Sequence, residues 1–118
     1  MYVDPEKEKV LILGGTGFIG KNLVNYFTKK DMLEYNVKVV SRQSGVDILN
    51  YEEISKCVSE FKPHDIFNLA SHGGSLHYVK EFAADVVSDN IQMALNIYRS
   101  VKENASNCRI ITPFSNCS

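Results

Sequence analysis

Apolar and polar residues follow two different spacings along the chain, and the spacing predicts where strands and helices lie. Short apolar runs bounded by polar residues are typical of buried strands, as in the VLIL run at residues 10–13. Apolar residues three and four positions apart indicate helices, as with Ile54 and Val58 ahead of the helix-breaking Pro63. The predicted strands are residues 9–14, 36–42, 65–70 and 108–114, and the predicted helices are residues 18–29, 51–61 and 79–104.

Strands and helices alternate strictly, with short connections, which predicts a parallel sheet covered by helices on both faces. We expect an α/β fold of the doubly wound Rossmann type, with strand order 3-2-1-4 and an end just after the fourth strand. Ligands of such sheets bind at the carboxyl ends of the strands, where the strand order reverses. The predicted order puts this switch point between the first and fourth strands.

A glycine-rich segment, VLILGGTGFIG at residues 10–20, joins the first strand to the first helix. Gly14 or the adjacent Gly15 allows a sharp exit from the strand at positive φ. Gly17 lets the backbone approach a pyrophosphate, and Gly20 lets the helix pack closely on the strand. Phosphates then lie at the positive end of the helix dipole. The alternative is a strand-to-helix turn without a ligand, which gives no reason for three aligned glycines.

Composition narrows the possible classes of protein. The 118 residues suffice for one domain with a real core but are few for a complete cofactor enzyme. The net charge is −1 and no basic run extends beyond Lys29 and Lys30, so the sequence lacks the basic patch typical of nucleic-acid binding. The charged start MYVDPEKEKV is unlike a signal peptide, and no apolar run of 18 residues could span a membrane. We therefore expect a cytoplasmic protein without nucleic-acid or membrane partners.

Cysteines and histidines do not form a recognisable site. The cysteines are odd in number and have no C-x-x-C spacing, which argues against a disulfide framework or a zinc site and for reduced thiols. The histidines are not spaced as metal ligands with a cysteine or carboxylate pair, so we expect polar loop residues and no metal. These residues are Cys57, Cys108, Cys117, His64, His72 and His77.

The end of the second predicted strand bears on the choice of cofactor. Dinucleotide sites usually carry an Asp or Glu there, about 20 residues after the glycines, to bind the ribose 2′-hydroxyl. This chain has Ser41 followed by Arg42, and the guanidinium could pair with a 2′-phosphate. The hypothesis is NADP rather than NAD, and the alternative is a solvated Arg42 at a strand end.

Several motifs occur in order: GGTGFIG, the pair Asp47–Ile48, PHDIFNLAS, DNIQMALNIYRSV and IITPFSNCS. Together they resemble the extended short-chain dehydrogenase/reductase family, the NAD(P)-dependent epimerases, dehydratases and reductases of sugar nucleotides. The resemblance covers nearly the whole chain. It implies that Asp47 and Ile48 contact the adenine, with Ile48 packing on the ring. The alternative for Asp47 is an ordinary turn aspartate. The resemblance further implies that the adenosine side is lined by Leu69, Ala70 and Ser71. It also implies that the pyrophosphate is held by the turn that contains Gly14, Thr16, Gly17, Phe18, Ile19 and Gly20.

The resemblance also implies a catalytic position near the end of the chain. Ser115 matches the family's active-site Ser or Thr, which hydrogen-bonds the substrate oxygen at the reacting carbon. Ser115-x-Cys117, with Gly73 and Gly74, is similar to the GDP-L-fucose synthase branch, where a Cys acts as acid and base. The alternative for Cys117 is a buried thiol.

The family's Tyr-x-x-x-Lys pair follows the Ser, but the two such strings in this chain precede it. They are Tyr26 with Lys30 and Tyr98 with Lys102, and we interpret both as accidental. We therefore interpret residues 1–118 as the N-terminal, NAD(P)-binding portion of a longer enzyme, without turnover of its own. The alternative function is a non-catalytic NAD(P)-binding or sensing module.

The long predicted helix, residues 79–104, has a broad apolar face that could cover both the sheet and a second surface. In the resembling family this helix helps to form a dimer, which suggests a homodimer here. The alternative is a helix buried wholly by its own domain.

Overall fold

The structure, a computed structural model, describes residues 8–14, 18–30, 35–41, 44–70 and 80–112. Each predicted strand and helix has a counterpart among these residues, with ends that differ by a few positions. The elements are β1 (Glu8–Leu13), α1 (Phe18–Lys30), β2 (Tyr35–Val40), α2 (Tyr51–Phe61), β3 (Asp65–Asn68), α4 (Ala83–Asn104) and β4 (Arg109–Ile111).

The four strands form one sheet in which every pairing is parallel. Its order is β2-β1-β3-β4, so the predicted order 3-2-1-4 is wrong. β3 pairs with β1 through the register Leu11 to Ile66, and β4 pairs with β3 through Ile66 to Ile110. The sheet is still doubly wound, because the 2-1-3-4 order also reverses direction at one point. That switch point lies between β1 and β3 instead of between β1 and β4.

Burial explains why β1 takes the centre of the sheet. Its residues from Val10 to Leu13 are at most 1% exposed, so both of its faces are covered. β2 instead carries Lys38 at its middle, followed by an exposed Val39, and only its last residue, Val40, is fully buried, a pattern suited to a sheet edge. The connection through α2 therefore crosses β1 and delivers β3 to the far side of it.

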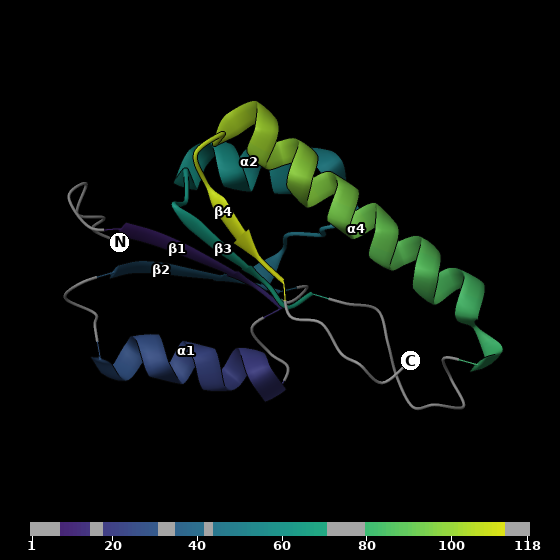
Figure 1. Ribbon diagram of the computed structural model, residues 1–118, viewed down its shortest axis with the longest axis horizontal. Helices are drawn as coiled ribbons and strands as arrows, with labels where there is room; N and C mark the ends of the chain where they lie inside the picture. The colour runs from purple at the N-terminus through teal and green to yellow at the C-terminus, as the bar shows by residue number, and fades with distance from the viewer. Residues whose placement is uncertain (1–7, 15–17, 31–34, 42–43, 71–79, 113–118) are drawn as a thin grey trace.

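Helices cover the two faces of the sheet separately, α1 on one face and α2 with α4 on the other (Figure 1). On the α1 side, Phe27 packs with Val10 and Ile12 of β1. The opposite face carries the larger core, in which residues of β1, β3, α2 and α4 meet. Its fully buried members include Leu11, Leu13, Ile54, Val58, Ile66 and Ile97.

The ends of α2 follow from its sequence. Asn50 caps the N-terminus, where its Oδ1 accepts the backbone N–H groups of Glu52 at 3.0 Å and Glu53 at 3.4 Å. At the C-terminus Lys62 adopts a left-handed conformation with φ of 51°, and its N–H donates to the carbonyl of Val58. Pro63 follows directly, so the helix ends at Phe61 as predicted.

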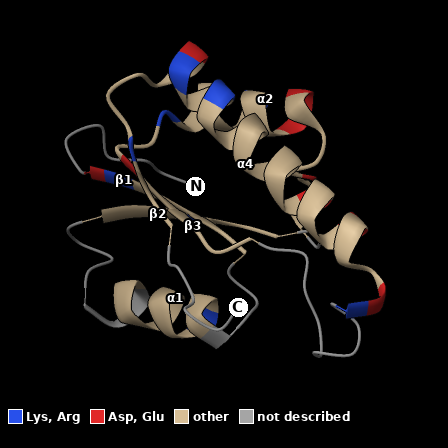
Figure 2. Ribbon diagram, turned by 45° about the vertical axis from the view of Figure 1, so that its right-hand side comes forward, with Lys and Arg blue, Asp and Glu red and all other residues tan. Residues whose placement is uncertain are grey.

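One side of α4 faces solvent although it is apolar. Val87, Ile91, Leu95 and Tyr98 recur every three or four residues and are 54–58% exposed. The opposite side buries Met93, Ile97 and Val101 against the sheet. The stretch from Ile91 to Tyr98 contains no charged residue, and α4 is tan there in Figure 2. The predicted broad apolar face is therefore confirmed, and its outer half is uncovered by the described residues.

Within the part of the chain that the structure describes, no helix combines the length and the apolar character needed to cross a membrane.

Candidate functional site

Gly14 stands where β1 ends, at the switch point between β1 and β3. Its φ is +81°, and its N–H donates to the carbonyl of Val40 at 2.9 Å. A Cβ on this residue would come within 2.8 Å of the backbone of Leu69 and Ala70. The predicted sharp exit at positive φ is confirmed for Gly14. The backbone just after β3 therefore approaches Gly14 too closely for any side chain at this position.

α1 begins at Phe18, four residues after Gly14, so its N-terminus lies at the same edge of the sheet. Gly20, in the first turn of α1, is buried. Ile19 is exposed, and the first turn carries no acidic side chain that would oppose a bound anion. Gly15, Thr16 and Gly17 lie outside the described residues.

Leu69 and Ala70 run alongside Gly14 at the end of β3. The Leu69 N–H donates to the carbonyl of Leu13 at 2.9 Å, which extends the β1–β3 pairing by one residue. The Leu69 side chain packs on the α1 side and that of Ala70 on the α4 side. Among the family-implied positions nearby, Ser41 is half-buried at the end of β2, whereas Arg42, Ser71, Ser115 and Cys117 lie outside the described residues.

The segment holding Asp47 and Ile48 follows β2 and forms a turn closed by the N–H of Asn50, which donates to the carbonyl of Asp47 at 3.0 Å. Asp47 is exposed, and its Oδ1 accepts the N–H of Leu49 at 3.0 Å. The Ile48 side chain is only 7% exposed and packs in the core beneath α4. The expected packing of the Ile48 side chain on an adenine ring differs from this placement. Because the side chain is used in core contacts, it is chiefly the backbone of Ile48 that a ligand could contact.

Two buried oxygens at the carboxyl edge were not predicted as site atoms. Asn68 Oδ1, at the end of β3, and Thr112 Oγ1, just after β4, have no hydrogen-bond partner in the described part of the structure. Buried polar atoms are nearly always paired, so such a pair on neighbouring strands is unusual. Sequence inspection could have noted the polar Asn68 inside the apolar run IFNLA, which is the one signal it offered.

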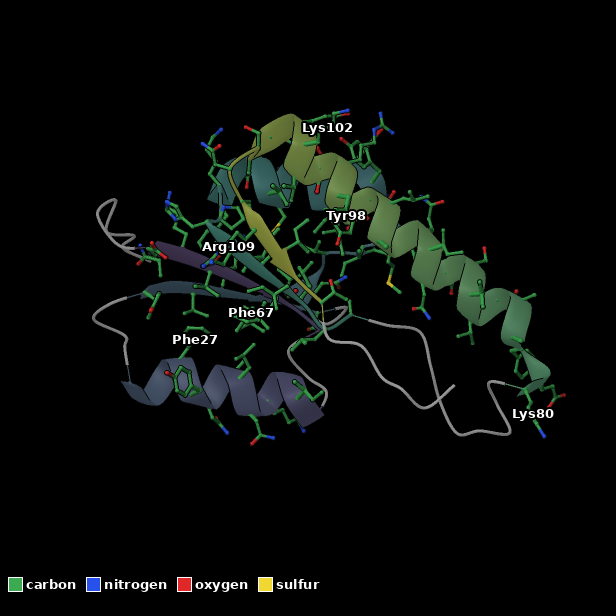
Figure 3. All side chains as sticks on the ribbon, viewed as in Figure 1. Phe27, Phe67, Lys80, Tyr98, Lys102 and Arg109 are labelled. Carbon is green, nitrogen blue, oxygen red and sulfur yellow. The ribbon has the colours of Figure 1, made fainter. Side chains whose placement is uncertain are left out.

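The Tyr-x-x-x-Lys strings lie away from this edge. Tyr98 and Lys102 are on α4 toward its C-terminal end, well removed from the carboxyl ends of the strands (Figure 3). They border a shallow hollow of about 360 Å³ beside the start of β4, together with Cys108 and Ile110. Tyr26 is exposed on α1.

The two cysteines among the described residues, Cys57 and Cys108, are free thiols. Burial, with a smaller contribution from the Asp65 carboxylate, raises the pKa of Cys108 to about 11. Burial also raises the pKa of Cys57. Both thiols are therefore protonated at neutral pH, and the thiolate is the reactive form.

His64 has a structural contact at the opposite, amino edge of the sheet. Its Nδ1 accepts the N–H of Lys9 at 2.9 Å. His72 and His77 lie outside the described residues. Across the ranges that are described, no group of three or more His, Cys, Asp or Glu side chains could hold a metal ion.

The residues at the carboxyl edge fit a bound dinucleotide. The N-terminus of α1 is the positive end of the helix dipole, and its first turn has no acidic side chain, which suits phosphate. Asp47 presents an exposed carboxyl group, an acceptor suited to the amine of adenine. A parallel sheet with a positive-φ glycine at its switch point and a helix starting four residues later defines a doubly wound, nucleotide-binding type of α/β domain.

The chain belongs to the NAD dependent epimerase/dehydratase family, whose sequence model matches residues 10–118. GDP-L-fucose synthase from Dictyostelium discoideum is 28% identical over 97 residues, which cover 82% of this chain and 30% of that protein. GDP-L-colitose synthase from Yersinia pseudotuberculosis is 26% identical over 96 residues, covering 81% of this chain and 30% of that protein. The chain thus spans about 30% of the length of these curated relatives.

Among solved structures, a GDP-mannoheptose C4 reductase from Campylobacter jejuni with NADP bound superposes with a TM-score of 0.77. The match is 24% identical and covers 90% of this chain and 32% of that chain. At this identity the likeness shows the fold, and it agrees with the doubly wound sheet described above.

Proposed function

We propose that the chain is the cofactor-binding portion of an NAD(P)-dependent enzyme that epimerises, dehydrates or reduces a nucleotide-linked sugar. The observation that carries the proposal is the meeting of Gly14, the start of α1 and the Leu69–Ala70 pair at the β1/β3 switch point. Membership of the family and the sugar-nucleotide enzymes among its relatives favour this activity. The nicotinamide, when bound, accepts or donates a hydride.

Within this proposal each group of residues has a separate task. The turn from Gly14 to Gly20, with Thr16, Gly17, Phe18 and Ile19, binds the pyrophosphate through backbone N–H groups. Asp47 accepts from the adenine amine, the Ile48 backbone lies beside the ring, and Leu69, Ala70 and Ser71 line the adenosine side. Ser41 and Arg42 face the ribose 2′ position. Ser115 and Cys117 are the proposed catalytic residues, Ser115 as donor to the substrate oxygen and Cys117 as acid and base.

The direct test uses the full-length protein and two measurements. Calorimetric titration should give saturable binding of NADPH or NADH. Mixing with a GDP-linked 4-keto-6-deoxyhexose should change the absorbance of the reduced nicotinamide. Absence of binding would contradict the whole proposal. Binding without hydride transfer to any nucleotide-linked keto sugar would favour the second candidate, a non-catalytic NAD(P)-binding or sensing module.

Arg42→Ala tests the preference for NADP. We expect the substitution to weaken NADPH binding about tenfold, because a guanidinium–phosphate pair is a strong charge-assisted contact. NADH lacks the 2′-phosphate, so its dissociation constant should stay within about twofold. Arg99→Ala, on the outer surface of α4, is the matched control and should affect neither cofactor. An unchanged dissociation constant for NADPH in Arg42→Ala would remove Arg42 from the site.

We also propose that the protein forms a homodimer through α4. The uncovered apolar side of this helix, formed by Val87, Ile91, Leu95 and Tyr98, is suited to packing against its copy across a two-fold axis. Leu95→Glu would bury a charge at the centre of that contact. Sedimentation velocity of the full-length protein should therefore show a dimer for the unmodified chain and a monomer for Leu95→Glu.

Tyr26→Glu is the control for this experiment. Tyr26 is exposed to the same degree as the α4 residues but lies on α1, across the sheet. Its substitution should leave the dimer intact. A monomer for the unmodified protein at high concentration, or a dimer that survives Leu95→Glu, would reject α4 as the interface.

A further inference from the structure

Asn96 is a polar residue buried in the apolar side of α4, and it is 4% exposed. Its neighbours on that side, Met93 and Ile97, belong to the main core. Both ends of its amide are hydrogen-bonded. Asn96 Nδ2 donates to the carbonyl of Ile48 at 2.8 Å, and Asn96 Oδ1 accepts from Gln92 Nε2 at 2.8 Å. A buried amide is costly unless it is paired, so these two bonds define its orientation.

The carbonyl that Asn96 holds belongs to the peptide unit between Ile48 and Leu49. The N–H of this same unit donates to Asp47 Oδ1 at 3.0 Å. A peptide unit is planar, so holding its C=O group also sets the direction of its N–H group. Asn96 is thereby linked to the Asp47 carboxyl group through one rigid peptide, although the two side chains belong to α4 and to the loop after β2.

Asp47 is otherwise held only through its backbone in the described hydrogen bonds. Its N–H donates to Glu53 Oε1 at 3.3 Å, and its carbonyl accepts from the N–H of Asn50 at 3.0 Å. Neither bond sets the rotamer of the carboxyl group. The bond from Leu49 N–H does, and because Asp47 is exposed its carboxyl group remains within reach of a ligand.

From these contacts we infer that Asn96 is a positioning residue, which orients the Asp47 carboxylate toward the adenine amine through the Ile48–Leu49 peptide. The inference rests on the proposed function, in which Asp47 accepts from that amine. Without Asn96 the peptide unit can rotate, and water can satisfy the exposed Asp47 and Leu49 groups. The turn then persists while the carboxylate samples several orientations, and the preorganisation that favours adenine is lost.

The test compares NADPH with its hypoxanthine analogue, in which an oxo group replaces the adenine amine, on the full-length protein. The unmodified protein should bind NADPH about tenfold more tightly, because the oxo group places an acceptor against the carboxylate. Asn96→Leu should bring the ratio of the two dissociation constants to within about twofold. A purely structural role would weaken both ligands alike and leave this ratio unchanged.

Asn104→Ala is the matched control. Asn104 is another α4 amide, and it donates to Ser55 Oγ of α2 at 3.1 Å without touching the Asp47 turn. Its loss should lower stability and preserve the ratio. If Asn96→Leu does not fold, Gln92→Ala replaces it. Gln92 is exposed, and its side chain donates to Asn96 Oδ1, so its loss frees the Asn96 amide without emptying the core. This variant should reduce the ratio of the two dissociation constants about threefold.

The outcomes separate the inference from the function on which it rests. Failure of the unmodified protein to bind either NADPH or NADH would contradict the proposed function. Binding with no preference for adenine would overturn the inference, as would an unchanged preference in the folded variants of Asn96 or Gln92. Loss of preference in these variants, with retention in Asn104→Ala, would establish the positioning role.

Discussion

Gly14→Ala is expected to lower the free energy of unfolding of the full-length protein by about 3 kcal/mol. Two costs add at this position. An L-residue at a φ of +81° is strained, and its Cβ would lie 2.8 Å from backbone atoms of Leu69 and Ala70. Backbone atoms cannot rotate away as the end of a side chain can. Relief therefore requires β1 and β3 to separate at the switch point, and urea unfolding should report the loss.

Gly45→Ala separates the two costs. Gly45 has a φ of +86°, but nothing lies within 4 Å of the position of its Cβ. Its substitution should cost only the backbone strain, about 1 kcal/mol. Equal losses for the two variants would show that the approach of the chain after β3 does not restrict Gly14.

Phe27→Ala is expected to cost about 3 kcal/mol, because it empties the centre of the smaller core. Phe27 is 7% exposed, and its ring meets those of Tyr35 at 5.4 Å and Phe67 at 5.9 Å between centroids. Figure 3 shows Phe27 and Phe67 in the layer between α1 and the sheet. Loss of the Phe27 ring loosens α1, so NADPH binding should weaken and the unfolding midpoint should fall.

Tyr26→Ala is the matched control for this prediction. Tyr26 is the preceding aromatic residue of α1 and touches Phe27 edge-on, but it is 53% exposed. Removing an exposed ring should cost less than about 1 kcal/mol and leave cofactor binding unchanged. A Phe27→Ala protein as stable as Tyr26→Ala would mean that α1 does not depend on this contact.

The positions of strands and helices were predictable because they depend on local patterns. The ends of α2 illustrate this, since Asn50 and Pro63 mark them in the sequence and cap or break the helix in the structure. The order of the strands was predicted wrongly. Alternation of elements is the same for 3-2-1-4 and 2-1-3-4, so the pattern alone could not choose between them. Lys38 in the middle of β2 was the available signal for an edge strand.

The glycine motif of the candidate site was predictable from the sequence, but the contacts that hold the surrounding residues in place were not. Gly14 carries the positive φ that the glycine spacing implied. By contrast, Ile48 was expected beside an adenine ring and its side chain lies in the core. The sequence placed Asn96 in a long helix but did not indicate its contact. The carbonyl to which Asn96 donates belongs to Ile48, which is 48 positions away in the sequence. The roles assigned to Arg42, Ser115 and Cys117 stay predictions.

The sequence by itself determined the α/β class, the approximate ends of the elements, the positive φ of Gly14 and the family, because each depends on short local patterns or on their order along the chain. Only the tertiary structure decided which strand lies beside β1, which backbone closes against Gly14, and which helix residue holds the Asp47 turn. Each of these depends on contacts between segments tens of residues apart. Such contacts form only when burial of β1 on both faces draws α1 to one side of the sheet and α2 with α4 to the other.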